Sequence, residues 1–251
     1  MNYTMMIFSP TGGTEKAAAA LTSGWGQRIA TVDLTNAAID FSQFSFQSED
    51  TVVIAVPSYG GRVPSLAAER IQKVHGNGAK AVLVCVYGNR AYEDTLVELE
   101  DLAKATGFKV TAAVAAIAEH SIVRRFAAGR PDAEDQAILA GYGQTILKRL
   151  QSGAEAGPIP GNRPYKKAGG SRMAPQTGDT CSQCGLCAAR CPAGAIDKND
   201  AKAADPTKCI SCMRCVAICP QHAKFLDAAK LAGISAMLEK VCVERKKCEL
   251  Y

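Results

Sequence analysis

The sequence lacks the features that would tie the chain to a membrane or to a nucleotide. No apolar run reaches the roughly 20 residues that a spanning helix needs. The first residues lack the basic start and long apolar stretch of a signal peptide, so we expect a cytoplasmic chain. Neither a phosphate loop ending in Gly-Lys-Ser/Thr nor a Gly-x-Gly-x-x-Gly fingerprint occurs, which argues against direct use of nucleoside triphosphates or nicotinamide cofactors.

Histidine and aromatic residues are also scarce, with three histidines and 6% aromatics. The formal net charge is +5, but no basic run is interleaved with aromatic residues and no DNA-binding motif is recognisable. We therefore expect no nucleic-acid partner. His75 and His222 have no chemistry-bearing neighbours in the sequence, so we expect structural or surface roles for both.

Cysteine, in contrast, is abundant, and eight of the eleven cysteines fall into two copies of one register. The register is Cys-x2-Cys-x2-Cys-x3-Cys-Pro, the bacterial spacing for [4Fe–4S] clusters. Zinc sites instead show Cys-x2-Cys pairs separated by long gaps. The eight predicted ligands are Cys181, Cys184, Cys187, Cys191, Cys209, Cys212, Cys215 and Cys219.

This repeat resembles the two-cluster bacterial ferredoxins over residues 178–225 and implies a small α+β domain. In that family the fourth cysteine of each run binds the other cluster. The resemblance therefore implies one cluster on Cys181, Cys184, Cys187 and Cys219, and a second on Cys209, Cys212, Cys215 and Cys191. Of the remaining cysteines, Cys85 is expected to be a buried hydrophobe. Cys242 and Cys248, in a basic tail, could be inert thiols or have a redox or metal role.

Residues 1–150 alternate between apolar strands and helical segments. Continuous apolar strands between helices indicate a parallel sheet that is covered on both faces. The sequence thus predicts an α/β domain with a doubly wound, five-stranded parallel sheet, in which ligands bind at the carboxyl ends of the strands. The expected strands are Tyr3–Phe8, Ile29–Leu34, Thr51–Val56, Ala79–Val86 and Lys109–Ile117.

The loop after the first strand combines hydroxyls and glycines at the start of a helix, where anions bind readily. It resembles the flavodoxin phosphate loop, Ser/Thr-x-Thr-Gly-x-Thr. That resemblance covers about residues 1–150 and implies a flavodoxin-like fold that binds FMN. The residues that match are Ser9, Thr11, Gly12, Gly13 and Thr14.

Two later loops occupy the positions of the flavodoxin loops that hold the isoalloxazine ring. An aromatic side chain can stack on the ring, and glycines allow the backbone to approach it. Tyr59 and Tyr92 could instead be ordinary core aromatics. Asn89 could present its amide to the pyrimidine edge. The predicted FMN residues in these loops are Ser58, Tyr59, Gly60, Gly61, Tyr87, Gly88, Asn89 and Tyr92.

The loop over residues 119–130 is longer than a minimal flavodoxin requires and contains a Glu, a His, a Ser and three Arg. One interpretation makes His120 or Ser121 a catalytic proton donor beside the flavin, with the arginines binding an anionic substrate or partner. The other interpretation gives His120 a hydrogen bond at a strand end and leaves the arginines solvated.

The domain organisation follows from these segments. We expect a flavodoxin-like FMN-binding domain at 1–150, a Gly/Pro-rich linker at 151–177, a two-cluster ferredoxin domain at 178–225, and a C-terminal helix and tail at 226–251. The linker could wrap the first domain or be flexible. The stretch Leu226–Lys247 is helix-compatible, and we expect a packing helix followed by a solvated tail, Glu244-Arg-Lys-Lys247.

The whole chain resembles fused flavodoxin–ferredoxin proteins of anaerobes, which implies electron transfer between two [4Fe–4S] clusters, FMN and an external redox partner. The alternatives are an FMN-dependent oxidoreductase that reduces a small substrate, and a redox or oxygen sensor. In residues 178–225, six Lys or Arg outnumber four Asp, so an acidic redox partner is expected. A homodimer, in which the flavin of one chain meets the clusters of another, stays open.

Overall fold

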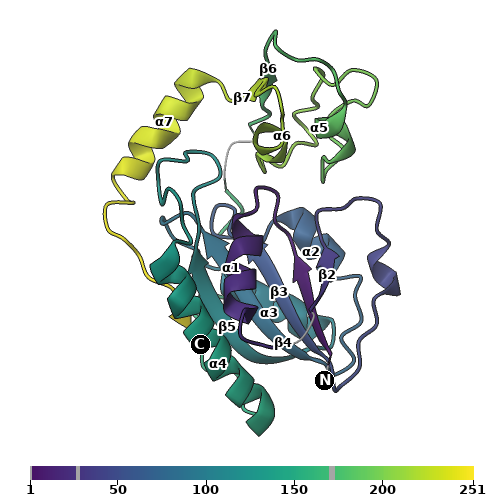
Figure 1. Cartoon of the computed structure of the whole chain (residues 1–251), viewed down its shortest axis with the longest axis vertical. Helices are drawn as coiled ribbons and strands as arrows, with labels where there is room; N and C mark the ends of the chain where they lie inside the picture. The colour runs from purple at the N-terminus through teal and green to yellow at the C-terminus, as the bar shows by residue number, and fades with distance from the viewer. Residues whose placement is uncertain (1, 27–28, 170–172) are drawn as a thin grey trace.

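The computed structural model describes residues 2–26, 29–169 and 173–251. Helices and strands alternate through the first part of the chain, and short elements dominate the last third (Figure 1). In chain order the elements are β1 (Tyr3–Ile7), α1 (Gly13–Thr22), β2 (Ala30–Asp33), the 3-10 helix η1 (Phe41–Gln43), β3 (Thr51–Pro57), α2 (Ser65–Ile71), β4 (Lys80–Tyr87), α3 (Thr95–Ala105), β5 (Lys109–Ile117), α4 (Ala133–Ser152), β6 (Gln176–Thr177), α5 (Leu186–Ala189), α6 (Arg214–Ala217), β7 (Lys224–Phe225), α7 (Ala228–Glu239) and β8 (Glu249–Leu250).

The main sheet has the order β2-β1-β3-β4-β5-β8, and β1 to β5 are parallel. The order 2-1-3-4-5 is that of the flavodoxin-like doubly wound fold. The predicted fold class and the five predicted strands are therefore confirmed. The direction of winding reverses between β1 and β3, and in such folds ligands bind outside the carboxyl ends of the strands at this point.

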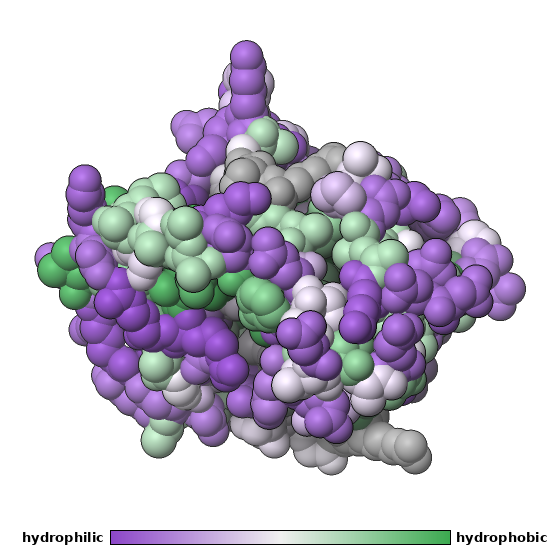
Figure 2. All heavy atoms as spheres, turned by 90° about the horizontal axis from the view of Figure 1, so that it is seen from above, coloured by the Kyte–Doolittle hydropathy of each residue, from purple (hydrophilic) through white to green (hydrophobic). Residues whose placement is uncertain are grey.

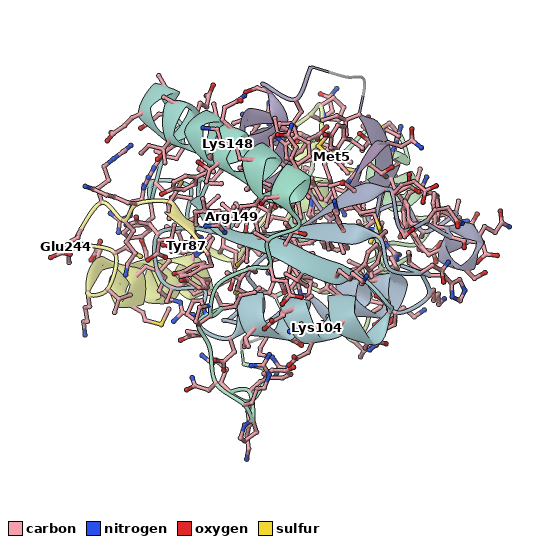
Figure 3. All side chains as sticks on the ribbon, turned by 90° about the horizontal axis from the view of Figure 1, so that it is seen from below. Met5, Tyr87, Lys104, Lys148, Arg149 and Glu244 are labelled. Atoms are coloured by element: carbon pink, nitrogen blue, oxygen red, sulfur yellow. The ribbon has the colours of Figure 1, made fainter. Side chains whose placement is uncertain are left out.

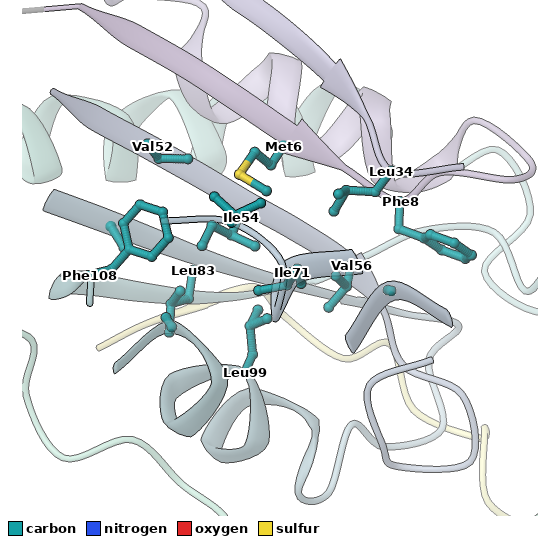
Figure 4. Close-up of a cluster of buried hydrophobic side chains, with 14 of the residues drawn as sticks. Met6, Phe8, Leu34, Val52, Ile54, Val56, Ile71, Leu83, Leu99 and Phe108 are labelled. Carbon is teal, nitrogen blue, oxygen red and sulfur yellow. The ribbon is translucent and has the colours of Figure 1, made fainter. Parts of the chain in front are cut away.

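Helices cover both faces of the sheet, which explains why its strands are apolar at consecutive positions. Figure 3 shows α4, with Lys148 and Arg149, on one side of the sheet and α3, with Lys104, on the other. In β3, Val52, Ile54 and Val56 face the core under α2 and α3, whereas Val53 and Ala55 face the core under α1 and α4. Figure 4 shows the first of these two cores. Cys85 is buried in the same core, as predicted.

The cysteine-rich domain lies over the carboxyl-end edge of the sheet (Figure 1). Figure 2 shows the molecule from this side, where hydrophilic side chains surround smaller hydrophobic areas. Its β6 and β7 pair antiparallel, and α5 and α6 are single turns that lie within the two cysteine runs. Two arginines join the domains: the buried Arg70 of α2 donates to the Pro192 carbonyl at 2.7 Å, and Arg214 donates to the Thr35 hydroxyl at 2.7 Å. The domains therefore share a hydrogen-bonded interface.

The described part of the 151–177 linker wraps the first domain along α3. The carboxylate of Asp94, which is 1% exposed, accepts hydrogen bonds from the backbone N–H of Asn162 at 2.8 Å and of Lys166 at 2.7 Å. Arg163 pairs with Asp101, and Ile159 packs against the core. The path of the linker is therefore fixed by hydrogen bonds from its backbone N–H groups to the buried Asp94 carboxylate.

Loss of the Asp94 carboxylate is expected to release this wrapped segment. In Asp94→Ala the N–H groups of Asn162 and Lys166 lose their acceptor and turn to water, because a buried unpaired donor is costly. Trypsin cleavage after Lys166 should then rise severalfold over the parent protein. Asp101→Ala, which removes only partly exposed contacts to Arg163 and Tyr165, is the matched control and should change cleavage much less. Equal cleavage in parent and Asp94→Ala would refute this role.

The C-terminal tail is docked on the first domain, although Glu244, Arg245 and Lys247 keep exposed side chains as predicted. After α7 the chain returns to the sheet edge, where β8 pairs antiparallel with β5 through Val114–Leu250 and Ala115–Glu249. Arg245 forms ion pairs with the start of α4, including Asp132 at 2.9 Å. The segments that precede and follow the cysteine-rich domain in the sequence are thus both bound to the first domain.

Candidate functional site

A cavity opens at the carboxyl ends of β1, β3, β4 and β5, where the fold predicts a ligand. Seven of the thirteen predicted FMN residues line it, together with residues of the 119–130 loop. Hydroxyls at the first helical turn of α1 suit an anion, because the first N–H groups of a helix have no intrahelical acceptor. Tyr59 and Tyr87 offer aromatic faces to a flat ring. The predicted residues that line the cavity are Thr11, Gly13, Thr14, Ser58, Tyr59, Tyr87 and Gly88.

Four other predicted FMN residues shape the loops without lining the cavity. The Ser9 hydroxyl accepts from the Glu15 N–H at 3.0 Å and so caps α1, and Gly12 takes φ +89° as the helix begins. Gly60 and Gly61 have φ +61° and +84° in a turn that is closed by two backbone hydrogen bonds between Tyr59 and Arg62. Positive φ at both central residues strongly favours glycine. These residues therefore set the backbone of the site.

The structure gives Asn89 and Tyr92 other partners. The buried amide of Asn89 donates to the Glu244 carbonyl at 2.8 Å, and its oxygen accepts from the Lys246 N–H at 3.1 Å. The Tyr92 hydroxyl donates to Glu249 at 2.9 Å. Both side chains hold the C-terminal tail, beside which Tyr87 also lies (Figure 3). Sequence reasoning missed this role, because the partners are more than 150 residues away in the chain.

His120 lies in the cavity wall in one definite tautomer. Its Nδ1 accepts from the backbone N–H groups of Ile122 at 3.2 Å and Val123 at 3.1 Å, so the ring proton is on Nε2. Burial, aided by the charge of Arg90, lowers the pKa of His120 below its usual 6.5. The ring is placed against Gly88, where a Cβ would come within 2.7 Å of His120. His120 is thus a neutral hydrogen-bond donor.

The three arginines of the 119–130 loop all have carboxylate partners within the chain. Arg124 pairs with Glu119, Arg125 with Glu239 of α7, and Arg130 with the buried Asp135. Arg124 and Arg125 keep exposed side chains, as the second interpretation expects, whereas Arg130 is buried in its ion pair and is not solvated. The loop is closed on itself by further bonds, including one from the Gly129 N–H to Glu119 at 3.0 Å.

This geometry predicts that His120 stays a neutral Nε2–H tautomer at pH 7. In the unfolded chain His120 binds a proton near pH 6.5, whereas in the native site its lowered pKa keeps it neutral at that pH. The free energy of unfolding should therefore fall as the pH drops below 6.5. Nitrogen-15 NMR of ring-labelled histidine in the oxidised protein checks the tautomer, with His75→Gln and His222→Gln variants assigning the signals. An imidazolium spectrum for His120 at pH 7 would contradict the structure.

The eight predicted cluster cysteines surround two cavities in the cysteine-rich domain. Each cavity is lined by four of them, in the two sets that the ferredoxin resemblance implies. Among the described residues, no three His, Cys, Asp or Glu side chains converge as the ligands of a single ion do. The outer cavity, so named here, is lined by Cys181, Cys184, Cys187 and Cys219, and the inner cavity by Cys191, Cys209, Cys212 and Cys215.

Backbone N–H donors near the cysteine sulfurs, and the burial of two of the cysteines, make these cavities suitable for cubane clusters. The Ala195 N–H donates to Cys191 Sγ and the Ala223 N–H to Cys219 Sγ, both at 3.3 Å, as expected around iron-bound thiolates. Burial raises the pKa of Cys212 to about 11 and of Cys215 to about 12. At neutral pH these thiols would lose their protons only when their sulfur atoms bind a metal centre.

The inner cavity faces the first domain. Ile210 packs against its core, and the buried Met213 and Pro192 flank the arginine contacts between the domains. Tyr59, from the loop after β3, lies close enough that burial and then the charge of a Cys212 thiolate raise the pKa of its hydroxyl. The outer cavity instead reaches solvent through the exposed Cys184 and Leu186.

Comparisons with known proteins concern the two halves separately. A family model described as a 4Fe-4S dicluster domain matches residues 175–220. No curated relative matches the sequence.

Solved flavodoxins resemble the first domain. A flavodoxin from Streptococcus pneumonia TIGR4 is 17% identical, covering 59% of this chain and 99% of that one, with a TM-score of 0.42. Flavodoxin 1 from Bacillus cereus is 16% identical over 59% of this chain and 98% of that one, with a TM-score of 0.44.

A larger protein is also similar. Rubredoxin oxygen:oxidoreductase from Desulfovibrio gigas is 16% identical, covering 60% of this chain with a TM-score of 0.45, and the match spans 36% of that protein. The fold assignment itself rests on the strand order and connections described above. The chain therefore joins a flavodoxin-like α/β domain to a 4Fe–4S dicluster domain. In the described residues, no helix is long and apolar enough to cross a membrane.

Proposed function

We propose that this protein is an electron-transfer iron–sulfur flavoprotein that holds FMN and two [4Fe–4S] clusters. FMN would bind in the cavity lined by Thr11, Thr14, Tyr59 and Tyr87, with its phosphate at the start of α1. The clusters would occupy the inner and outer cavities. Clusters exchange single electrons and FMN accepts one or two, so the pair can join one-electron carriers to a two-electron centre.

The observation that carries this proposal is the position of the inner cavity beside the predicted flavin loop. Burial and then the charge of a Cys212 thiolate raise the pKa of the Tyr59 hydroxyl, and Arg70 and Arg214 hold the two domains together at the same edge. We infer an order of electron transfer in which an external redox partner meets the outer cluster near Cys184, the inner cluster follows, and FMN is last. The exposed basic residues of this domain, Arg190, Lys198, Lys202 and Lys208, favour an acidic partner.

An anaerobic spectroelectrochemical titration of the loaded protein tests this function. For an electron carrier, the reduction potentials of the flavin and the clusters should overlap, because widely separated potentials would trap the electron on one centre. Chemical analysis of the same sample should give one FMN per chain, with iron and sulfide for two clusters. A preparation that binds clusters but no FMN would overturn the proposal.

The second candidate is a flavoenzyme that reduces a small substrate beside His120. The position of His120 in the cavity wall favours it. A neutral Nε2–H can orient a substrate by a hydrogen bond, while Arg130 of the same loop is buried in its ion pair with Asp135. In an enzyme, His120→Ala would abolish turnover and leave FMN bound. In a carrier, the same variant would keep its rate of electron transfer from clusters to flavin.

A further inference from the structure

Lys224 is a buried lysine that lies between the two cluster cavities. It belongs to β7, is 3% exposed, and lines both the outer and the inner cavity. Charged lysines are rarely buried to this extent without a partner. No family motif marks this position, because it follows the second cysteine run by five residues.

The partners that hold Lys224 are neutral. Its Nζ donates to the Thr177 hydroxyl and to the Ala201 carbonyl, both at 2.6 Å. An ammonium group has three N–H donors, so two neutral acceptors leave its charge uncompensated. The groups that could balance this charge are the cluster thiolates, since Lys224 lines both cavities together with their eight cysteines.

We propose that Lys224 is a shared cation that raises the reduction potentials of both [4Fe–4S] clusters together. This inference rests on the proposed function, since it requires that both clusters assemble. Reduction adds a negative charge to a cluster, and a buried cation stabilises that charge strongly where the local dielectric constant is low. Since one ammonium group lines both cavities, its charge shifts the two potentials in the same direction.

The test replaces the charge and measures both midpoint potentials by EPR-monitored titration of the anaerobic, cluster-loaded protein. Lys224→Met should shift both reduction equilibria at least tenfold toward the oxidised form, which is about 59 mV for one electron. Lys224→Arg, which keeps the charge, should restore both potentials. Lys198→Met removes an exposed lysine of the same domain and is the matched control, with potentials close to those of the parent protein.

A second variant covers the case in which Lys224→Met fails to assemble its clusters. Thr177→Asp keeps Lys224 but places a carboxylate at its Nζ, so it should lower both potentials by neutralising the charge. Iron and sulfide analysis of each sample shows whether both clusters are present, independently of their potentials. Missing clusters in the parent protein would refute the proposed function. Two clusters with unchanged potentials in both variants, or a shift of only one potential, would overturn the role of Lys224 alone.

Discussion

The double variant Cys181→Ala/Cys191→Ala is expected to lose both clusters, although both cysteines belong to the first run. Cys181 lines the outer cavity and Cys191 the inner one, so the pair removes one ligand from each site. The complementary variant Cys181→Ala/Cys219→Ala removes two ligands from the outer cavity only, and should keep the inner cluster. Iron analysis and EPR of the reduced proteins distinguish no cluster from one cluster.

The opposite pattern would contradict the crossed ligand sets. If each run bound its own cluster, Cys181→Ala/Cys191→Ala would keep one cluster and Cys181→Ala/Cys219→Ala would keep none. Cys242→Ala is the matched control, because Cys242 lies in the tail outside both cavities, and this variant should keep both clusters. Because each outcome is the presence or absence of a whole cluster, the effect is larger than that of any other change considered for this protein.

The second large effect is expected at the start of α1, where Thr11→Glu should weaken FMN binding by at least 100-fold. A phosphate carries between one and two negative charges at pH 7. Two unit charges 4 Å apart repel by about 4 kcal/mol at an effective dielectric constant of 20, and about 1.4 kcal/mol corresponds to tenfold in affinity. The loss of hydroxyl donation adds to this repulsion. Quenching of FMN fluorescence during titration of the apoflavin protein measures the affinity.

Two comparisons make the Thr11→Glu result specific. Thr145→Glu adds the same charge to an exposed position of α4 and should leave FMN affinity unchanged. Riboflavin, which lacks the phosphate, should bind Thr11→Glu about as well as the parent protein. Equal FMN affinities in Thr11→Glu and the parent would show that the phosphate does not bind at this helix terminus.

The parts of the fold that the sequence revealed are those with a repeating physical signal. Residues 52–56 are apolar at every position because both faces of β3 are covered, and this predicts a parallel strand directly. The spacing of the two cysteine runs likewise predicts the eight cluster ligands, because a fixed spacing is required to surround a cubane. The loops after β1 and β3 could be located because ligand sites in this fold follow the strand order.

The parts that the sequence did not reveal depend on contacts between distant segments. β8 has only two residues, too few for any periodicity, and it forms because the edge of β5 is available to pair. Asn89 looked like a flavin ligand, but its amide partners lie in residues 242–246. Lys224 gave no signal at all, since only the pairing of β6 with β7 brings it between the cavities.

The most direct test of the central claim is a flash-reduction experiment on the anaerobic protein loaded with FMN and clusters. A photochemical donor reduces the clusters, and the absorbance of the flavin then reports the arrival of electrons. The account predicts flavin reduction at a rate that does not depend on protein concentration, that slows in Arg70→Met as the domain contact with Pro192 is lost, and that is unchanged in Arg163→Met. A rate that rises in proportion to protein concentration, or a flavin that stays oxidised while the clusters are reduced, would contradict it.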